Sequence, residues 1–335
     1  MSRCTRYGAR SPGLLLLLAL IMPWLLLGTS AVAADKIRIA VLKFGTVNWE
    51  MDVIKRHQID LEQGFELDVV KLAGKQATMV ALQSGDVDIA ITDWIWVSRQ
   101  RAEGRPFTFV PYSTAVGALV ASPESGIDSL RDLKGKRLGI AGGPLDKSWL
   151  LFQALAHRDF GMDLKQEVTP VFGAPPLLSQ QLMQGRIDAV INFWPYVARL
   201  QAAGMKWIMG VREAAGALGL EGDIPIIGYT FNQHWAEDHR QALQGFIRAT
   251  TRAKAMLKQS DQEWARLRPL MKAADDATFE ALRDGFRAGI PEHWGTKERQ
   301  QAEKLFAILH QVGGKRLVGD ASRLTEGTFW PGVTY

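Results

Sequence analysis

Two tryptophans stand where predicted strands meet predicted helices. Trp94 and Trp194 each follow an apolar run typical of a buried strand, and they lie 100 positions apart. An indole offers a flat face for stacking or for contact with a cation. We expect these indoles to hold a ligand between them, one from each side of a cleft. The alternative is that both are core residues that cap their strands.

Charged and polar residues occupy similar positions along the chain. Ammonium groups and free backbone N–H groups at a helix start suit a carboxylate, a sulfonate or another oxyanion. Carboxylates there can orient a hydroxyl or amino group, coordinate a hard cation or cap the helix, and the sequence leaves these roles open. The candidate ligand-binding residues, besides the two tryptophans, are Asn48, Trp49, Lys75, Gln76, Asp93, Asp146, Lys147, Ser148, Asn192 and Tyr229.

Three kinds of catalytic or metal site are excluded by the spacing of residues. The passage 139–148 lacks the glycine before lysine that a phosphate-binding P-loop needs, because Asp146 stands there. His234 and His239 are five positions apart and do not share one helix face. No Gly-x-Ser-x-Gly motif is present. We therefore expect no catalytic residue, no metal and no cofactor.

Strands and helices alternate in the predicted order. This order is typical of α/β domains built on a parallel sheet, with ligands beyond the carboxyl ends of the strands. The expected strands are 36–42, 65–70, 87–91, 135–141, 168–171 and 187–191, and the expected helices are 49–63, 75–83, 147–160 and 177–184. Residues 234–311 read as mostly helical, and we expect them to pack on the first lobe.

An internal repeat divides the chain. Residues 82–94 and 182–194 share Leu, Gly, Asp, Ile and Trp without a gap. Each repeat is long enough for a small sheet, so the sequence predicts two similar lobes. Two extended segments, 116–121 and 224–231, are the expected crossings of a two-strand hinge. We expect one lobe from 34–119 and 228–335, and the other from 120–227.

The first 33 residues are typical of a cleaved export signal. A basic start precedes an apolar run, and Ala31-x-Ala33 suits signal peptidase. The alternative, a membrane anchor, is disfavoured because the run from Leu14 to Leu27 contains Pro23 and is shorter than the ~20 residues of a spanning helix. The segment also holds the only cysteine, Cys4. The remaining chain has 37 basic and 35 acidic residues, so the pI near 9.3 does not indicate a nucleic-acid binder.

Five passages carry a resemblance to a known family. The chain resembles the periplasmic substrate-binding proteins of ABC importers, in the NMT1-like group that includes sulfonate, taurine, nitrate and thiamine-precursor binders. The passages are 37–41, 82–90, 127–141, 182–189 and 192–196. The passage 127–141, which precedes a Gly-rich loop, is the most specific of them.

The resemblance implies a type II periplasmic binding fold with two Rossmann-like lobes. It also implies a monomer in the periplasm that binds a small organic ligand, anionic or zwitterionic, and delivers it to an ABC permease with a cytoplasmic ATPase. The aromatic passages 92–96 and 192–194 depart from relatives with small residues there, so we expect aromatic stacking on a larger ligand. An enzyme on the same scaffold, similar to pyrimidine-precursor synthases, and a receptor for a sensor or a periplasmic enzyme system are the alternatives.

Overall fold

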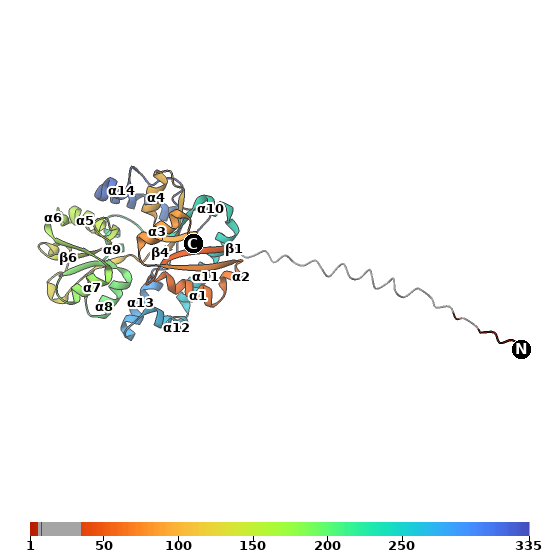
Figure 1. The fold of residues 1–335 in the computed structure, drawn as a ribbon. Helices are drawn as coiled ribbons and strands as arrows, with labels where there is room; N and C mark the ends of the chain where they lie inside the picture. The colour runs from red at the N-terminus through yellow and green to blue at the C-terminus, as the bar shows by residue number, and fades with distance from the viewer. Residues whose placement is uncertain (6–7, 9–34, 335) are drawn as a thin grey trace. The chain divides into compact units, whose positions relative to one another are not determined.

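The fold is given by a computed structural model that describes residues 1–5, 8 and 35–334. Residues from Asp35 onward form one compact unit (Figure 1). The predicted export signal falls almost entirely outside the described residues. No helix in the described part of the chain is long and apolar enough to cross a membrane.

The first sheet has five strands in the order β2-β1-β3-β10-β4. β1 pairs in parallel with β2 and β3, whereas β10 runs antiparallel to both β3 and β4. Its strands are β1 (Asp35–Leu42), β2 (Phe65–Leu72), β3 (Ile89–Asp93), β4 (Phe107–Ser113) and β10 (Ile227–Asn232). The helices that connect them are α1 (Val47–Arg56), α2 (Ile59–Glu62), α3 (Lys75–Ser84) and α4 (Trp94–Ala102).

The second sheet repeats this plan in the order β7-β6-β8-β5-β9. β6 pairs in parallel with β7 and β8, and β5 runs antiparallel to β8 and β9. Its strands are β5 (Gly117–Ala121), β6 (Arg137–Ala141), β7 (Thr169–Gly173), β8 (Ala189–Phe193) and β9 (Lys206–Gly210). Its helices are α5 (Lys147–Phe160), α6 (Leu164–Glu167), α7 (Pro175–Met183), α8 (Trp194–Ala202) and α9 (Val211–Ala217), with the short 3-10 turns η1 (Pro123–Ser125) and η2 (Leu130–Leu133) before β6.

The α/β architecture with two sheets confirms the expected fold class, but the sheets are mixed and not wholly parallel. In each sheet the antiparallel strand is the one that follows a passage of the chain from the other sheet. β5 enters the second sheet directly after β4, and β10 enters the first sheet after α9.

The internal repeat has a structural basis in two matching ion pairs. The guanidinium of Arg38 contacts both carboxylate oxygens of Asp88, at 2.6 and 3.1 Å, and donates to the carbonyl of Gly85 at 3.0 Å. Arg137 makes the same contacts with Asp188, at 2.7 and 3.2 Å, and with Gly185 at 2.9 Å. Bidentate arginine contacts fix geometry as well as charge. The shared Gly and Asp therefore tie β1 to the start of β3 in the first lobe, and β6 to the start of β8 in the second.

The C-terminal helices cover both lobes. α11 packs on α1 and on the first sheet, whereas α13 lies against α8 and α14 against α4 and α5. Figure 1 shows α12 and α13 on one side of the two sheets and α14 on the other. These helices are α10 (Gln233–Asp238), α11 (Arg240–Gln259), α12 (Asp261–Met271), α13 (Asp276–Ala288) and α14 (Thr296–Val318). They therefore contribute to the surfaces where the lobes meet.

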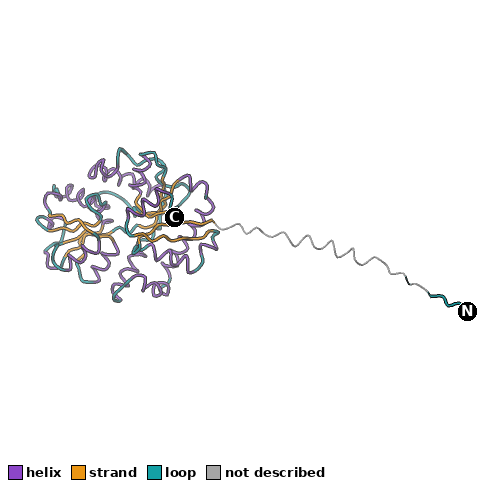
Figure 2. The backbone as a smooth tube through the Cα atoms, in the orientation of Figure 1, coloured by secondary structure: helices purple, strands orange, loops and turns teal. Residues whose placement is uncertain are grey.

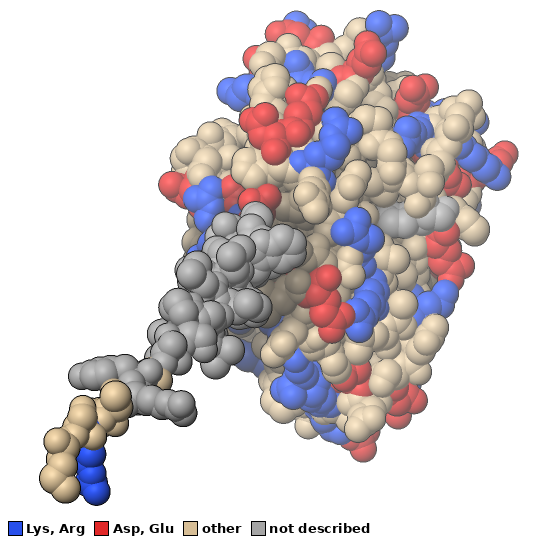
Figure 3. All heavy atoms as spheres, turned by 90° about the vertical axis from the view of Figure 1, so that its right-hand side faces the viewer, with Lys and Arg blue, Asp and Glu red and all other residues tan. Residues whose placement is uncertain are grey.

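Apolar side chains fill the space between sheets and helices. One cluster packs β1, β2 and β10 against α1, α11 and α12, and another joins the opposite face of the first sheet to the second lobe through α5 and α14. Figure 2 shows the two groups of strands with helices around each. On the face in Figure 3, acidic and basic residues are interspersed, as the nearly balanced charge of the chain predicts.

Candidate functional site

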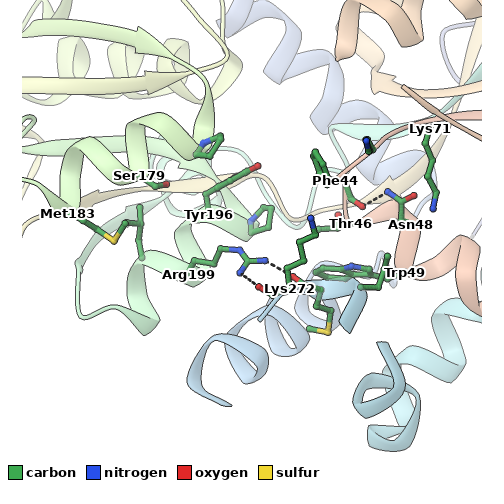
Figure 4. A pocket seen from close by; sticks show the side chains of 17 residues that line it. Phe44, Thr46, Asn48, Trp49, Lys71, Ser179, Met183, Tyr196, Arg199 and Lys272 are labelled. Atoms are coloured by element: carbon green, nitrogen blue, oxygen red, sulfur yellow. Dashed lines mark hydrogen bonds between the residues drawn. The ribbon is translucent and has the colours of Figure 1, made fainter. Parts of the chain in front are cut away.

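A cavity of about 620 Å³ lies where the first lobe, the second lobe and the end of α12 meet (Figure 4). Small-molecule sites in proteins commonly have volumes of about 300–1,000 Å³. The first lobe contributes Lys43, Phe44, Gly45, Thr46, Asn48, Trp49 and Lys71; the second contributes Pro176, Ser179, Met183, Pro195, Tyr196, Arg199 and Leu200; Leu270, Met271 and Lys272 close it. A molecule bound here would contact both lobes at once.

Every charged side chain that lines the cavity is basic. The four are Lys43, Lys71, Arg199 and Lys272, and no carboxylate is among the lining residues. Within the described part of the chain, none of the four forms an ion pair, although most other surface cations do. The cavity therefore offers uncompensated positive charge to a ligand.

Arg199 is fixed in place by backbone carbonyls. Its guanidinium donates to the carbonyl of Met271 at 2.7 Å and to that of Lys272 at 3.1 Å, so α8 of the second lobe is tied to the end of α12. Figure 4 shows the side chain reaching across the cavity to that end. Burial lowers the pKa of Arg199 from its usual value, because the charged form loses water. An anion bound in the cavity would stabilise the charged guanidinium of Arg199, which burial destabilises.

Phe44 forms an apolar face at the mouth of the cavity. Its side chain is 70% exposed, which is unusual for a phenylalanine. The ammonium groups of Lys272 and Lys43 lie 4.4 and 5.6 Å from the centre of its ring. Lys272 itself has a positive φ of 52° at the end of α12. The ring attracts both cations and holds positive charge at this mouth.

Asn48 and Trp49, two of the candidate ligand-binding residues, line the cavity. Asn48 donates through Nδ2 to the carbonyls of Leu42 and Gly45, both at 2.8 Å, and so shapes the loop after β1. Trp49 is 4% exposed and packs edge-on against Trp194, with ring centres 6.1 Å apart. Because both residues are buried, they form the wall of the cavity and project little into it.

A second charge cluster joins the two lobes. The Asp93 carboxylate, at the end of β3, contacts Lys75 of the first lobe at 3.1 Å and Lys147 of the second at 2.8 Å. Burial works against the charged form of Asp93, but Lys147 and Lys75 outweigh it and hold its pKa well below the usual range. The same carboxylate raises the pKa of Lys75. Asp93 thus takes the place that an external anion would otherwise occupy between these lysines.

Asp93→Asn is expected to lower the free energy of unfolding by about 1–3 kcal/mol at pH 7, since hydrogen bonds to charged groups contribute that much. Because the folded pKa of Asp93 is depressed, its contribution is present above its unfolded pKa near 3.9 and is lost as the pH falls below that value. Urea unfolding from pH 7 to pH 3 should therefore show a shallower acid loss in the variant. Parallel pH profiles for the two proteins would contradict this assignment.

The other polar candidates at this edge have mainly local contacts. Asp146 caps α5 by accepting from the backbone N–H groups of Ser148 and Trp149, at 3.0 and 3.2 Å. Burial raises the pKa of Asp146, in spite of Lys147 nearby. Ser148 is buried and Gln76 is exposed. None of these three residues lines the cavity.

Trp94 and Trp194 both begin a helix after a strand, but their surroundings differ. Trp94 is fully buried, donates through Nε1 to the carbonyl of Pro225 at 3.1 Å, and packs edge-on against Phe329. Trp194 lies against Trp49 and over Gly285 of α13. In the described structure, therefore, neither ring faces the other across a ligand space. Helix α13 packs on Trp194, and Phe329 of the C-terminal segment packs on Trp94.

Asn192 and Tyr229 are buried away from the cavity space. Asn192 donates to the carbonyl of Pro175 and to the Ser179 hydroxyl, both at 3.0 Å. The Tyr229 hydroxyl donates to the Glu50 carboxylate at 2.5 Å and accepts from Lys254 at 2.8 Å. Neither residue lines the cavity. Asn192 positions Ser179, which does, and Tyr229 belongs to a buried charged group under the first sheet.

Most of the residues that reach into the cavity were not among the sequence-predicted candidates. Phe44 and Tyr196 nevertheless lie in segments that carried a signal, since Phe44 shortly precedes the candidates Asn48 and Trp49, and Tyr196 ends the family passage 192–196. Arg199 follows Tyr196 by about one helical turn, and a projection of the helix would have placed both on one side. Lys272 had no signal, because nothing in the sequence brings the end of α12 to this cleft.

Comparison with known proteins identifies the family. The sequence profile described as "NMT1/THI5 like" matches residues 61–263, which is more than half of the chain. The chain belongs to the NMT1/THI5-like family. The resemblance inferred from the sequence is therefore confirmed. Comparison with curated protein sequences finds no match.

Solved structures share the fold of this NMT1/THI5-like chain. The periplasmic aliphatic sulphonate binding protein SsuA of Escherichia coli is 20% identical with a TM-score of 0.67, over 89% of this chain and 94% of that one. The alkanesulfonate-binding protein SsuA of Xanthomonas axonopodis pv. citri, bound to MOPS, is 17% identical with a TM-score of 0.67, over 90% and 99%. The desulfurization enzyme DSZB is 15% identical with a TM-score of 0.58, over 88% and 97%. These matches confirm the type II periplasmic binding fold.

Proposed function

We propose that this NMT1/THI5-like protein is the periplasmic solute-binding component of an ABC importer. It captures a small organic solute, anionic or zwitterionic, between its lobes and delivers it as a monomer to a permease with a cytoplasmic ATPase. The observation that carries the proposal is the cavity, because both lobes line it. A solute that contacts both lobes stabilises their closed arrangement, which a permease can recognise. Residues 1–33 would direct export and be removed.

The names of the structural relatives support this role. Two of them are sulfonate-binding proteins, and one of these is bound to MOPS, a molecule with a ring and a sulfonate. The cavity of the present chain combines basic side chains with the rings of Phe44, Trp49 and Tyr196. We infer that a ring or another apolar body stacks on these aromatic side chains, in place of the indole pair expected at positions 94 and 194.

We infer that the solute is bound without being converted. The lining residues include no imidazole, thiol or carboxylate that would serve as general base or nucleophile. The Ser179 hydroxyl is already engaged, since it donates to the carbonyl of Pro175 and accepts from Asn192. The enzyme DSZB shares the fold, so conversion of a bound solute is the outcome that would favour the alternative.

A solute panel tests the proposed function. Thermal shift and tryptophan fluorescence of the purified protein should find solutes that bind saturably, with Trp49 at the cavity wall as a reporter. Phe44→Ala should weaken binding by about tenfold, because a phenyl face of about 1.5 kcal/mol or more is lost. Phe172→Ala is the matched control, since Phe172 is 43% exposed on β7 outside the cavity. An absence of any bound solute, or turnover of one, would refute the proposal.

A further inference from the structure

We propose that the solute is an organic dianion, a small apolar body that carries two negative charges. This inference rests on the proposed function and specifies the substrate class of the same cavity. Its basis is the charge of the lining residues: four cations, Lys43, Lys71, Arg199 and Lys272, and no anion. In the described structure these cations have no carboxylate partner, so an anion that enters the cavity meets positive charge that no side chain of the protein has paired.

The neighbouring charge cluster shows how cations are compensated where the lobes meet. Lys75 and Lys147 both contact the carboxylate of Asp93, and the Asp146 carboxylate also acts electrostatically on both lysines. The protein thus supplies two carboxylates for two cations there. No carboxylate lines the cavity beside its four cations, so a solute with two negative charges compensates more of them than a monoanion does.

The arrangement of the cations adds a second argument. Lys43 and Lys272 hold their ammonium groups over one phenyl ring, at 5.6 and 4.4 Å from its centre. The Arg199 guanidinium is fixed to the backbone at Lys272 and is partly desolvated. Lys71, near the end of β2, pairs in register with Val41 of β1. Val41 precedes Lys43 by two residues, so the backbone brings Lys71 near the same loop. Lys43 and Lys272 therefore hold positive charge around one ring at the cavity, where an anion would be attracted.

The remaining surface of the cavity defines the body of the ligand. Apart from the basic groups, the wall is mostly apolar and aromatic, and it gives few hydrogen-bonding groups to a sugar-like or peptide-like solute. Its apolar members are Phe44, Trp49, Pro176, Met183, Pro195, Leu200, Leu270 and Met271. A flat or short apolar skeleton with two acid groups fits both features of the wall.

Three probes with one ring and different charge test this inference. Benzenesulfonamide, benzenesulfonate and benzene-1,3-disulfonate carry zero, one and two charges, and the sulfonates stay ionised across the pH range used. Isothermal titration of the purified protein should show the disulfonate binding at least about tenfold more tightly than the monosulfonate. Its affinity should also fall more steeply with added salt, because more charge is screened.

Lysine-to-methionine variants test whether the cavity charges cause the preference for the disulfonate. Lys43→Met and Lys272→Met should each reduce the ratio of disulfonate to monosulfonate affinity by about threefold or more, and Lys165→Met, an exposed position on α6 outside the cavity, should leave it unchanged. Equal affinities for the two sulfonates, or unchanged ratios in both cavity variants, would overturn the inference. If neutral or cationic solutes of the wider panel bind while the disulfonate does not, the dianion inference fails and solute binding stands. If no solute binds, both fail.

Discussion

Lys254→Met is expected to lower the free energy of unfolding by about 3–5 kcal/mol, because it leaves a buried carboxylate without its cation. Glu50 is fully buried in α1, and its two oxygens lie 3.0 and 2.9 Å from the ammonium of Lys254 on α11. The Tyr229 hydroxyl donates to the same carboxylate. These groups tie a helix of the first lobe, the strand β10 and a C-terminal helix together.

The pH dependence of this variant should have a definite sign. Burial raises the pKa of Glu50, although Lys254 and Tyr229 act against the shift. Burial also lowers the pKa of Lys254, against the attraction of Glu50. A carboxyl group with a raised folded pKa contributes stability below its unfolded pKa and loses it as the pH rises through the folded value. Without Lys254 the pKa of Glu50 rises further, so Lys254→Met should gain stability as the pH falls from 8 to 5.

Chemical unfolding of wild type and variants measures both effects. Lys258→Met is the matched control, since Lys258 lies on the same helix in an exposed pair with Glu292, and such pairs contribute about 0–1 kcal/mol. The double variant Glu50→Gln with Lys254→Met should recover part of the loss, because no charge is then buried. A loss below about 1 kcal/mol for Lys254→Met would show that the buried pair is not a main source of stability.

Trp94→Ala should also destabilise the protein by about 3–5 kcal/mol, which is typical of a large aromatic residue removed from a core. The side chain is fully buried, and its loss leaves a void against Phe329 and an unpaired carbonyl at Pro225. Because the indole does not line the cavity, solute affinity should be unchanged at a temperature where the variant is folded.

The comparison with a second tryptophan makes this prediction specific. Trp207, on β9, is 40% exposed, so Trp207→Ala should cost less stability than Trp94→Ala. Urea unfolding gives the stability and titration with a bound solute gives the affinity. If Trp94→Ala weakens solute binding without a large loss of stability, the indole acts on the ligand, as the spacing of 94 and 194 led us to expect, and the core role is wrong.

The repeated βαβ architecture could be predicted from the sequence because its signals are local. The alternation of apolar residues in 36–42 and 135–141 reflects strands buried on a sheet. Gly85 and Gly185 have positive φ values of 79° and 68° where α3 and α7 give way to the next strand. Asp88 and Asp188 each pair with an arginine two strands away in the chain. Each lobe needs a glycine with positive φ and an aspartate that pairs with an arginine, so the same residue types recur at the same spacing in the sequence.

The binding surface was only partly predictable, because it depends on which strand ends remain uncovered. Asn48 and Trp49 follow β1, and the loop there stays open to the cavity. The equivalent end of β3 is occupied by the lysines that pair with Asp93 and by the core around Trp94. The ends of these two neighbouring strands thus have different environments, because a cavity remains between Asn48 and Trp49 and the end of α12, whereas Phe329 packs on Trp94.

The α/β lobes, their number and the family could be predicted from the amino-acid sequence, because all three depend on periodic patterns and short motifs. The charge of the cavity could not, because its residues come from distant parts of the chain. Arg199 meets the backbone of Lys272, a residue 73 positions later at the end of a helix without any motif. Contacts between residues so far apart depend on how whole helices pack, and no local pattern of residue types records that packing.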